Sequence, residues 1–460
     1  MRDGTPPPSR CGVCATCGDN RRVTLHRGDL PPGPRQSTTN QSVRLWHDPL
    51  GFQKATRERY GEPFTMRMHP VGPLVVVSDP ESVHRVLTGD PEIFLAGRAN
   101  GRILPILDCE SVLVIDGDKH RHRRHLLMPS FRAASVARLE NLMVHQTEAA
   151  IRRWPVDQPL SLLPSLRDIT LEVILRAVIS VPDPASHLEL AVRVRRMLSP
   201  AASAALWLGR GSRSWWSPAS IFEHRRRAVH AFVRDELMRR RGQGAPDGPT
   251  DVLDVLMAGT DAAGAPIDDR SICDEVVTLL LAGHETTSTA LAWAFERILR
   301  HPAVLARAQA AVADNDTVYL DALVRESLRI RPPLVDAVRL TTEGVTLGGR
   351  DVPAGAIVMV SIPLVHHRAD IYPAPEVFSP ERFLEHHPGP SEWVPFGGGP
   401  RRCLGAELAM LEMKTVIATV LASTDLEPER GLPEHPRLFG TALLPSRRAS
   451  VVVRGRTFQR

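Results

Sequence analysis

The chain has 460 residues, 43% of them hydrophobic and 24% charged, a balance typical of a globular protein with a sizeable core. The formal net charge is +5, but no dense basic tract alternates with aromatic residues, so nucleic acid is not expected as a partner. No run approaches the roughly 18 apolar residues that a membrane span requires, and the polar start has no signal-peptide core. We therefore expect a soluble, cytoplasmic protein.

The 6 cysteines are too few and too unevenly spaced for a disulfide scaffold in a chain of this length. Cys11, Cys14 and Cys17 lie in a lead rich in proline, arginine and glycine, which we predict to be flexible over residues 1–40. Their spacing suits metal ligands, with His26 as a conceivable fourth. No fourth cysteine follows, so chance cysteines in a disordered tail are the favoured interpretation. Order is expected to begin near Trp46.

Apolar spacing and turn residues then predict the first elements, in order a helix at 49–60, a hairpin of strands at 64–68 and 74–78, and a helix at 80–88. Residues 94–116 are expected to form a loop. A strongly basic helix is predicted to begin at Gly117, with His120 and Arg124 on one face at i, i+4 spacing. Taken alone, this segment is interpreted as a solvated helix face.

The middle of the chain is predicted to be largely helical, with segments at 133–154, 166–181 and 222–241. An irregular region before the last of these contains Trp207, Trp215 and Trp216. Clustered tryptophans can pack in a core or form the lid of an apolar cavity, and the sequence favours neither.

The longest helical pattern covers 268–300, and its centre is unusual. An apolar run from Val276 to Ala282 is followed directly by Gly283-His284-Glu285-Thr286-Thr287. Thr286 could donate back to the carbonyl of Ala282 and loosen the helix. Polar residues with low helix propensity inside a buried helix indicate a site that handles protons, although an ordinary packing irregularity remains the alternative.

A further helix at 319–331 carries Glu326 and Arg329 at i, i+3 spacing, where the two side chains can pair. Arg382, in the later run Pro-Glu-Arg-Phe, could join them. Such an ion network fixes one arrangement of the chain better than it performs chemistry, so a structural role is expected. Strand-like alternation follows at 340–361.

Near the C-terminal end, a glycine-rich loop at 396–405 brings Cys403 to the start of an apolar helical run at 404–421. Backbone N–H groups and the helix dipole at this point favour a thiolate. A thiolate held in this way can be a nucleophile, a redox thiol or an axial ligand to haem iron. The loop alone leaves these alternatives open.

In combination these motifs resemble the cytochrome P-450 family, over nearly everything from about residue 45 to the end. The family's haem loop is matched at Phe396, Gly399, Arg401, Cys403 and Gly405. Its oxygen-activating helix motif is matched at Ala282, Gly283, Glu285, Thr286 and Thr287. The pair Glu326 and Arg329, the later Arg382, and the pattern at His120 and Arg124 stand in the family's order.

The resemblance implies a mainly α fold with small β-sheets (α+β), in which residues 41–460 form a single haem domain of about a dozen helices. The cofactor implied is haem b, with Cys403 as its iron ligand and Phe396 packed on the sulfur side. The implied partners of the haem propionates are His120, Arg124, Arg339 and Arg401. This reverses the interpretation of the basic helix, although Arg121, Arg123 and Arg402 are still expected to form an outward basic face.

Glu285 and Thr286 are implied to relay protons to bound dioxygen. The substrate pocket implied by family position is walled by Leu281, Ala282, Val335, Val338 and Leu443. Residues 94–116 and 200–222 are expected to act as mobile covers.

The function implied is that of a monooxygenase that hydroxylates or epoxidises a small lipophilic molecule. Electrons are expected from NAD(P)H through a separate ferredoxin reductase and ferredoxin, and the protein is expected to be a monomer. A peroxide-driven or isomerising haem-thiolate enzyme is the first alternative, but such relatives generally lose the acid–alcohol pair that is intact here. A haem-based sensor is the second, and the short polar lead hardly supplies an output module.

Overall fold

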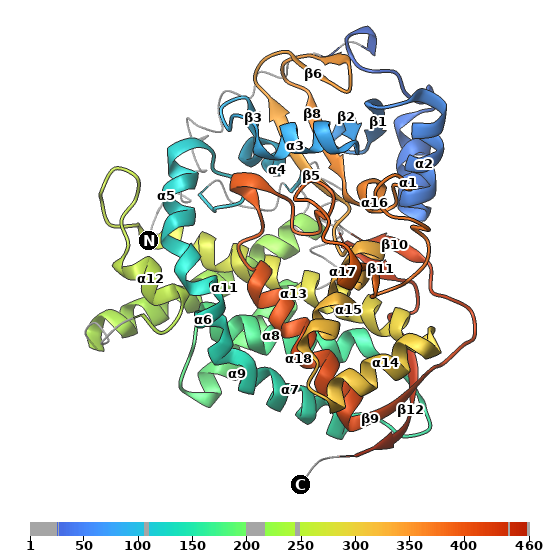
Figure 1. Ribbon diagram of the computed structural model, residues 1–460. Helices are drawn as coiled ribbons and strands as arrows, with labels where there is room; N and C mark the ends of the chain where they lie inside the picture. Colours follow the sequence, from blue (N-terminus) through green and yellow to red (C-terminus); the bar gives the residue numbers. More distant parts are fainter. Residues whose placement is uncertain are drawn as a thin grey trace.

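The computed structural model describes residue 25 and residues 27–104, 110–198, 217–243, 249–439 and 442–457. A small β-rich region lies against one end of a larger helical region (Figure 1). The predictions for Cys11, Cys14, Cys17, His26 and the tryptophans at 207, 215 and 216 lie outside the described residues.

The elements are as follows. The helices are α1 (Thr38–His47), α2 (Pro49–Tyr60), α3 (Pro80–Thr88), α4 (Ala96–Ile103), α5 (Gly117–Leu127), α6 (Ala133–Val136), α7 (Glu140–Arg153), α8 (Leu162–Val178), α9 (Pro184–Met197), α11 (Pro218–Gln243), α12 (Val252–Ala258), α13 (Asp269–Leu299), α14 (Pro302–Ala313), α15 (Thr317–Ile330), α16 (Ile362–His366), α17 (Arg382–Glu385) and α18 (Ala406–Ser423). The strands are β1 (Phe64–Met68), β2 (Gly72–Val77), β3 (Phe94–Leu95), β4 (Pro159–Ser161), β5 (Asp336–Thr341), β6 (Val345–Leu347), β7 (Arg350–Val352), β8 (Ile357–Ser361), β9 (Thr424–Pro428), β10 (Pro436–Phe439), β11 (Ala442–Pro445) and β12 (Ser450–Arg456).

Local sequence explains where several helices begin. Asp79 caps α3 by accepting the N–H of Ser82 at 2.8 Å, and Pro80 occupies the first turn, where no N–H donor is needed. Asp268 caps α13 in the same way, accepting the N–H groups of Arg270 and Ser271. These signals are local, so the start of each helix could be read from the sequence.

The main sheet has the order β1-β2-β8-β5-β3. Strands β2 and β8 are parallel, while the other neighbouring pairs are antiparallel. Strand β5 pairs with β8 from Asp336, opposite Ser361, to Leu340, opposite Ile357. This register carries Arg339 into the interior of the molecule, where the residue is 5% exposed.

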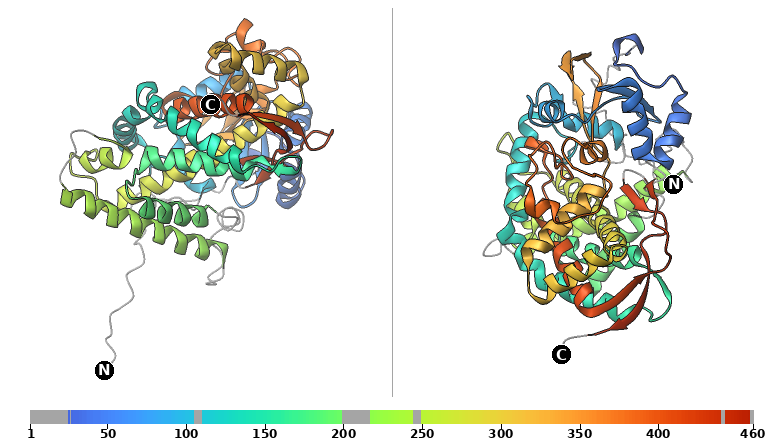
Figure 2. Two further views of the ribbon diagram at one scale, coloured as in Figure 1. Left: turned by 90° about the horizontal axis from the view of Figure 1, so that it is seen from below. Right: turned by 45° about the vertical axis from the view of Figure 1, so that its right-hand side comes forward.

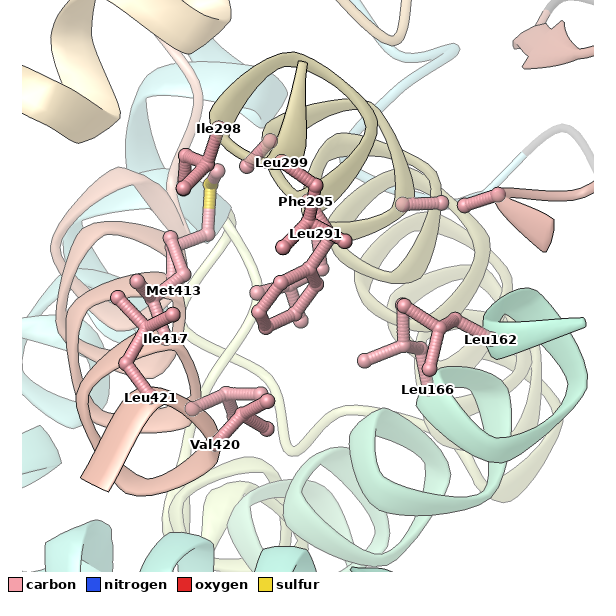
Figure 3. Packing of buried hydrophobic residues seen from close by; sticks show 14 of the residues in the cluster. Leu162, Leu166, Leu291, Phe295, Ile298, Leu299, Met413, Ile417, Val420 and Leu421 are labelled. Atoms are coloured by element: carbon pink, nitrogen blue, oxygen red, sulfur yellow. The ribbon is translucent and has the colours of Figure 1, made fainter. Parts of the chain in front are cut away.

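The core of the helical region is built around α13, which packs on α8, α11, α15 and α18. Figure 3 shows side chains of α8, α13 and α18 converging on one apolar cluster, with Phe295 at its centre and Leu166, Leu291 and Ile417 around it. Figure 2 shows the same bundle from two further directions, with the sheet at its periphery. The residues of α13 are therefore held between helices that are distant in sequence.

Three sequence expectations differ from the structure. Residues 94–116 are not simply a loop, because they contain β3 and α4. The packed chain begins before Trp46, since α1 starts at Thr38 and Leu30 is buried against the sheet cluster. The helix expected at 133–154 is divided into α6, a 3₁₀ turn and α7.

The start of α4 could not be predicted from the neighbouring sequence, because the residue that caps the helix lies 18–19 positions further along the chain. The carboxylate of Asp116 accepts the N–H of Gly97 at 2.7 Å and that of Arg98 at 2.9 Å. The two glycines among the 8 residues of α4 lower its helix propensity, which masked the helical spacing of Ala96, Ala99 and Ile103. Within the described part of the chain, no helix is long and apolar enough to cross a bilayer.

Candidate functional site

The Cys403 loop adopts a conformation that its glycines permit. Gly397 and Gly399 have positive φ angles of 64° and 61°, and a Cβ on Gly399 would lie 2.1 Å from the carbonyl oxygen of Leu87. The N–H of Cys403 donates to the carbonyl of Phe396 at 2.8 Å, closing the loop. Helix α18 then begins at Ala406, so Cys403 precedes the helix rather than occupying its first turn.

The thiol of Cys403 is accessible although the loop lies inside the molecule. The backbone N–H of Gly405 donates to its sulfur, and the charges of Arg402 and Arg124 also favour the thiolate. Desolvation by the surrounding protein is larger than these effects and raises the pKa of the Cys403 thiol. The loop and its cations alone therefore do not offset desolvation, and the Cys403 thiolate stays a prediction that concerns the metal-bound sulfur.

Basic side chains converge beside this loop. Arg401 donates to the carbonyl of Ile115 at 2.6 Å and pairs with Asp116 at 2.5 Å. Burial and the charge of Arg401 lower the pKa of Arg339 to about 10. Burial, with the charges of Arg401, Arg124 and Arg339, lowers the pKa of His120 to about 3. His120 is therefore neutral beside these arginines, and its expected role as a partner of the propionates stays a prediction.

The expected outward basic face is only partly present. Arg121 and Arg402 are exposed. Arg123 is buried instead, and its Nη1 lies 2.9 Å from Oε2 of Glu275 on α13. Glu275 also accepts the N–H of Val112 at 3.0 Å. Arg123 therefore ties α5 and the segment before it to α13.

The centre of α13 faces open space. Residues on either side of this stretch are buried, whereas Ala282 is exposed and Leu281, Gly283, Glu285 and Thr286 are partly exposed. The hydroxyl of Thr286 donates to the carbonyl of Ala282 at 2.7 Å, which confirms the predicted bond, although α13 continues unbroken. Residues 282–287 therefore lie where α13, which is otherwise largely buried, is accessible.

Helix α8 supplies partners that sequence reasoning missed. Arg167 forms a two-pronged ion pair with Glu285, with Nε 3.0 Å from Oε2. Thr170 lies 3.0 Å from Nδ1 of the buried His284. Burial and the charge of Arg167 lower the pKa of His284 to about 3, so this ring is neutral. Arg167 and Glu285 are 118 positions apart, and no local pattern marks their contact.

The expected pocket residues fall into separate groups. Val335 and Leu443 belong to one small apolar cluster with Leu438. Val338 packs in the cluster on the sheet side, and Leu281 packs against the helical cluster. The N–H of Leu443 donates to the carbonyl of Pro333 at 2.8 Å. Residues 105–109 and 200–216, parts of the expected covers, lie outside the described residues.

The centre of the ion network is buried, and Arg382 at its edge is partly exposed. Arg329 Nε lies 2.6 Å from Glu326 Oε2, both side chains are 0% exposed, and Arg382 Nε lies 3.6 Å from the same oxygen. Arg329 also donates to the carbonyl of His366 at 2.8 Å. His366 in turn accepts the N–H of Val394 at its Nε2, 3.0 Å away. The network thus reaches the segment that leads directly into the Cys403 loop.

A family model described as Cytochrome P450 matches residues 31–453 of the chain, which include the whole of this site. The chain belongs to the cytochrome P450 family. Cytochrome P450 135B1 of Mycobacterium tuberculosis (strain ATCC 25618 / H37Rv) is 39% identical to this P450 over 435 residues, which cover 92% of this chain and 91% of that protein. Cytochrome P450 137 of the same strain is 34% identical over 380 residues, covering 81% and 80%.

Solved structures give the same fold. Cyanobacterial CYP120A1 with bound retinoic acid has a TM-score of 0.78 and 23% identity, covering 93% of this chain and 99% of its own. The haem domain of cytochrome P450DA has a TM-score of 0.78 and 21% identity, covering 93% and 98%. The P450 is therefore an α+β protein with this fold and a monooxygenase by family.

The residues present fit the haem that the family implies. Arg339 is buried and Arg401 is partly buried, and the neighbouring carboxylate is that of Asp116, a charge imbalance that two propionates would correct. The Cys403 thiol is accessible and receives an N–H bond that would remain useful to a metal-bound sulfur. Gly397 and Gly405 have open space where a Cβ would be, so the loop leaves room beside the sulfur.

Proposed function

We propose that this P450 inserts one oxygen atom of O2 into a small lipophilic substrate, by hydroxylation or epoxidation. Haem, when bound, would supply the activation of dioxygen, and electrons would come from NAD(P)H through a separate ferredoxin reductase and ferredoxin. The single observation that carries the proposal is the accessible Cys403 thiol beside Arg339 and Arg401, whose two positive charges are met by one neighbouring carboxylate, that of Asp116. We also propose that the protein acts in the cytoplasm as a monomer.

Each residue has a defined task in this proposal. Cys403 would ligate the iron, while Arg124, Arg339 and Arg401 would bind the propionates as cations. The neutral His120 would donate a hydrogen bond to them. Phe396 would cover the sulfur side, where its carbonyl already holds the N–H of Cys403. The exposed Arg121 and Arg402 would attract an acidic ferredoxin.

Glu285 and Thr286 would move protons into the site. The hydroxyl of Thr286 is engaged by Ala282, and the carboxylate of Glu285 by Arg167. Both contacts would have to exchange for contacts with water during turnover, so Arg167 would control how often Glu285 is free to carry a proton. The pocket would be bounded by Leu281 and Ala282 on α13 and by Val335, Val338 and Leu443 on the opposite wall.

The carbon monoxide spectrum of the reduced, haem-loaded protein tests the ligand. We expect a Soret band strongly shifted to the red, as thiolate ligation requires, and its loss in Cys403→His even where haem is retained. A wild-type band at the position typical of histidine ligation would contradict the assignment of Cys403.

Turnover of Thr286→Ala tests the reaction class. We expect NADPH-driven oxidation with a ferredoxin pair to fall about a hundredfold, the low end of what one general acid–base group contributes. Peroxide-driven oxidation should survive because peroxide brings its own protons. Ser288→Ala is the matched control, since its hydroxyl also bonds back to α13, at the carbonyl of Glu285. Equal loss through both routes would argue against proton delivery, and peroxide turnover alone in the wild type would favour the peroxide-driven alternative.

A further inference from the structure

Asp336 is an acid without a partner in the interior. It is the first residue of β5, and in the register of the sheet it stands opposite Ser361. Among the described residues its carboxylate has no hydrogen bond or ion pair, and no neighbouring charge acts on it. Burial alone raises the pKa of Asp336 to about 6, so the group is mainly ionised at neutral pH.

Along the chain, Asp336 lies between the basic group beside the Cys403 loop and the apolar cluster of Val335 and Leu443. Three residues further along β5 is Arg339, in the basic group beside Cys403. The residue before it, Val335, belongs to the cluster of Leu443. The carbonyl of Leu443 in turn accepts the indole N–H of Trp293 on α13, at 2.5 Å. Asp336 thus lies where β5 and the β10–β11 hairpin meet α13.

Asp336 also shares a face of β5 with a proposed wall residue. Side chains alternate along a strand, so Asp336 and Val338 point to the same side. Val338 is buried among apolar residues, whereas Asp336 is partly accessible even though protein surrounds it. The carboxylate is therefore accessible to a small molecule on the side of β5 that Val338 also faces.

An ionised carboxylate in an apolar wall is unfavourable unless a group of opposite charge joins it. Apolar pockets commonly use one such polar group to orient a ligand. Resting on the monooxygenase function proposed above, we propose that Asp336 binds a positively charged nitrogen of the substrate. The substrate is then a lipophilic cation, held by Asp336 at one end and presented to the oxidising centre at the other.

The experiment compares matched ligands on the haem-loaded protein. The probes are alkyltrimethylammonium ions with chains of different length, kept below micelle-forming concentrations, and the uncharged tert-butyl analogues of the same length. A quaternary nitrogen cannot ligate iron and has no N–H to donate, so a preference for it reports charge alone. The shift of the Soret band on titration gives each dissociation constant.

We expect the wild type to bind at least one cation tenfold or more tightly than its uncharged analogue. Asp336→Asn, which keeps the shape of the side chain, should abolish that preference. Asp336→Leu should bind the uncharged analogue more tightly. Glu343→Gln, an exposed acid just after β5, is the control and should retain the wild-type preference. Thermal stability should not fall in Asp336→Asn, because no cation of the protein loses a partner.

Equal affinity for charged and uncharged probes in the wild type would overturn the proposal, as would an unchanged preference in Asp336→Asn. Failure of every cation in the series to shift the Soret band would contradict it equally. These outcomes are distinct from failure of the proposed function, because the titrations use protein that has already shown the thiolate-type carbon monoxide spectrum.

Discussion

Buried carboxylates in this P450 differ in whether a positive charge and hydrogen-bond donors pair with both of their oxygens. Both oxygens of Glu326 accept from Arg329, whereas Glu275 has a cation on one oxygen and no hydrogen-bond partner on the other within the described residues. Burial raises the pKa of Glu275 to about 7, against the opposing charge of Arg123. Because the pKa of Glu275 differs between the folded and unfolded states, the free energy of unfolding depends on pH.

The sign of this sensitivity follows from proton binding. Between about pH 4.5 and 7 the folded chain holds a proton on Glu275 that the unfolded chain has released. The contribution of Glu275 to stability therefore falls as pH rises through this window. Relative to wild type, Glu275→Gln should gain about 3 kcal/mol in unfolding free energy between pH 5 and pH 8. Urea unfolding at both pH values measures this, and a constant difference between the two proteins would contradict it.

Close approach of two helices shapes the opening at the centre of α13. A Cβ on Gly283 would lie 2.6 Å from Cδ1 of Ile174 on α8, so a larger residue there would require the Ile174 side chain to move. The same contact surface brings Arg167 to Glu285. The resemblance marked Gly283 as part of a motif, but it did not reveal which helix lies against it.

Gly283→Ala should therefore destabilise the protein by about 1–3 kcal/mol through overpacking, despite the better helix propensity of alanine. In an Ile174→Ala background the clash is removed, because the Cβ of residue 174 lies 3.7 Å away. There, Gly283→Ala should be neutral or stabilising by up to about 1 kcal/mol. Urea unfolding of the four proteins in this cycle provides the measurement. Additive effects would show that the two side chains do not collide.

Elements with local signals were predictable, and elements held by remote contacts were not. The helix at 49–60 matches α2 because Asp48 and Pro49 mark its start within the sequence itself. The helix α4 was missed because its cap is Asp116. The positions of the motif residues were found by resemblance. The Arg167–Glu285 pair and the low pKa of His120 depend instead on burial and on charges that only the fold brings together.

The folded body extends toward the N-terminus further than the sequence indicated. Leu30 packs with the sheet, the carbonyl of Pro32 accepts the N–H of Thr65 at 2.9 Å, and the side chain of Gln41 donates to the carbonyl of Gln36 at 2.8 Å. A Cβ on Gly33 would lie 1.8 Å from the carbonyl oxygen of Thr65. We propose that the haem domain includes these residues together with 41–460.

Two truncations test this boundary. A chain starting at residue 41 should lose the contacts of Leu30 and Pro32, and with them roughly 2–4 kcal/mol of stability and part of its haem incorporation. A chain starting at residue 25 keeps those contacts and serves as the reference. The thermal unfolding midpoint and the haem content are measured for both truncated proteins and compared. Identical behaviour would place the boundary at residue 41.

The short segment from Ser111 to Asp116 imposes an order on folding. It is held by Glu275 through the N–H of Val112 and by Arg401 through the carbonyl of Ile115, while Asp116 provides the N-terminal cap of α4. Helix α4 has only 8 residues and takes its cap from Asp116, so we do not expect it to be stable before this segment has docked. We therefore expect α4 to be among the last helices to form, and to acquire protection from hydrogen exchange only after the Cys403 loop has closed.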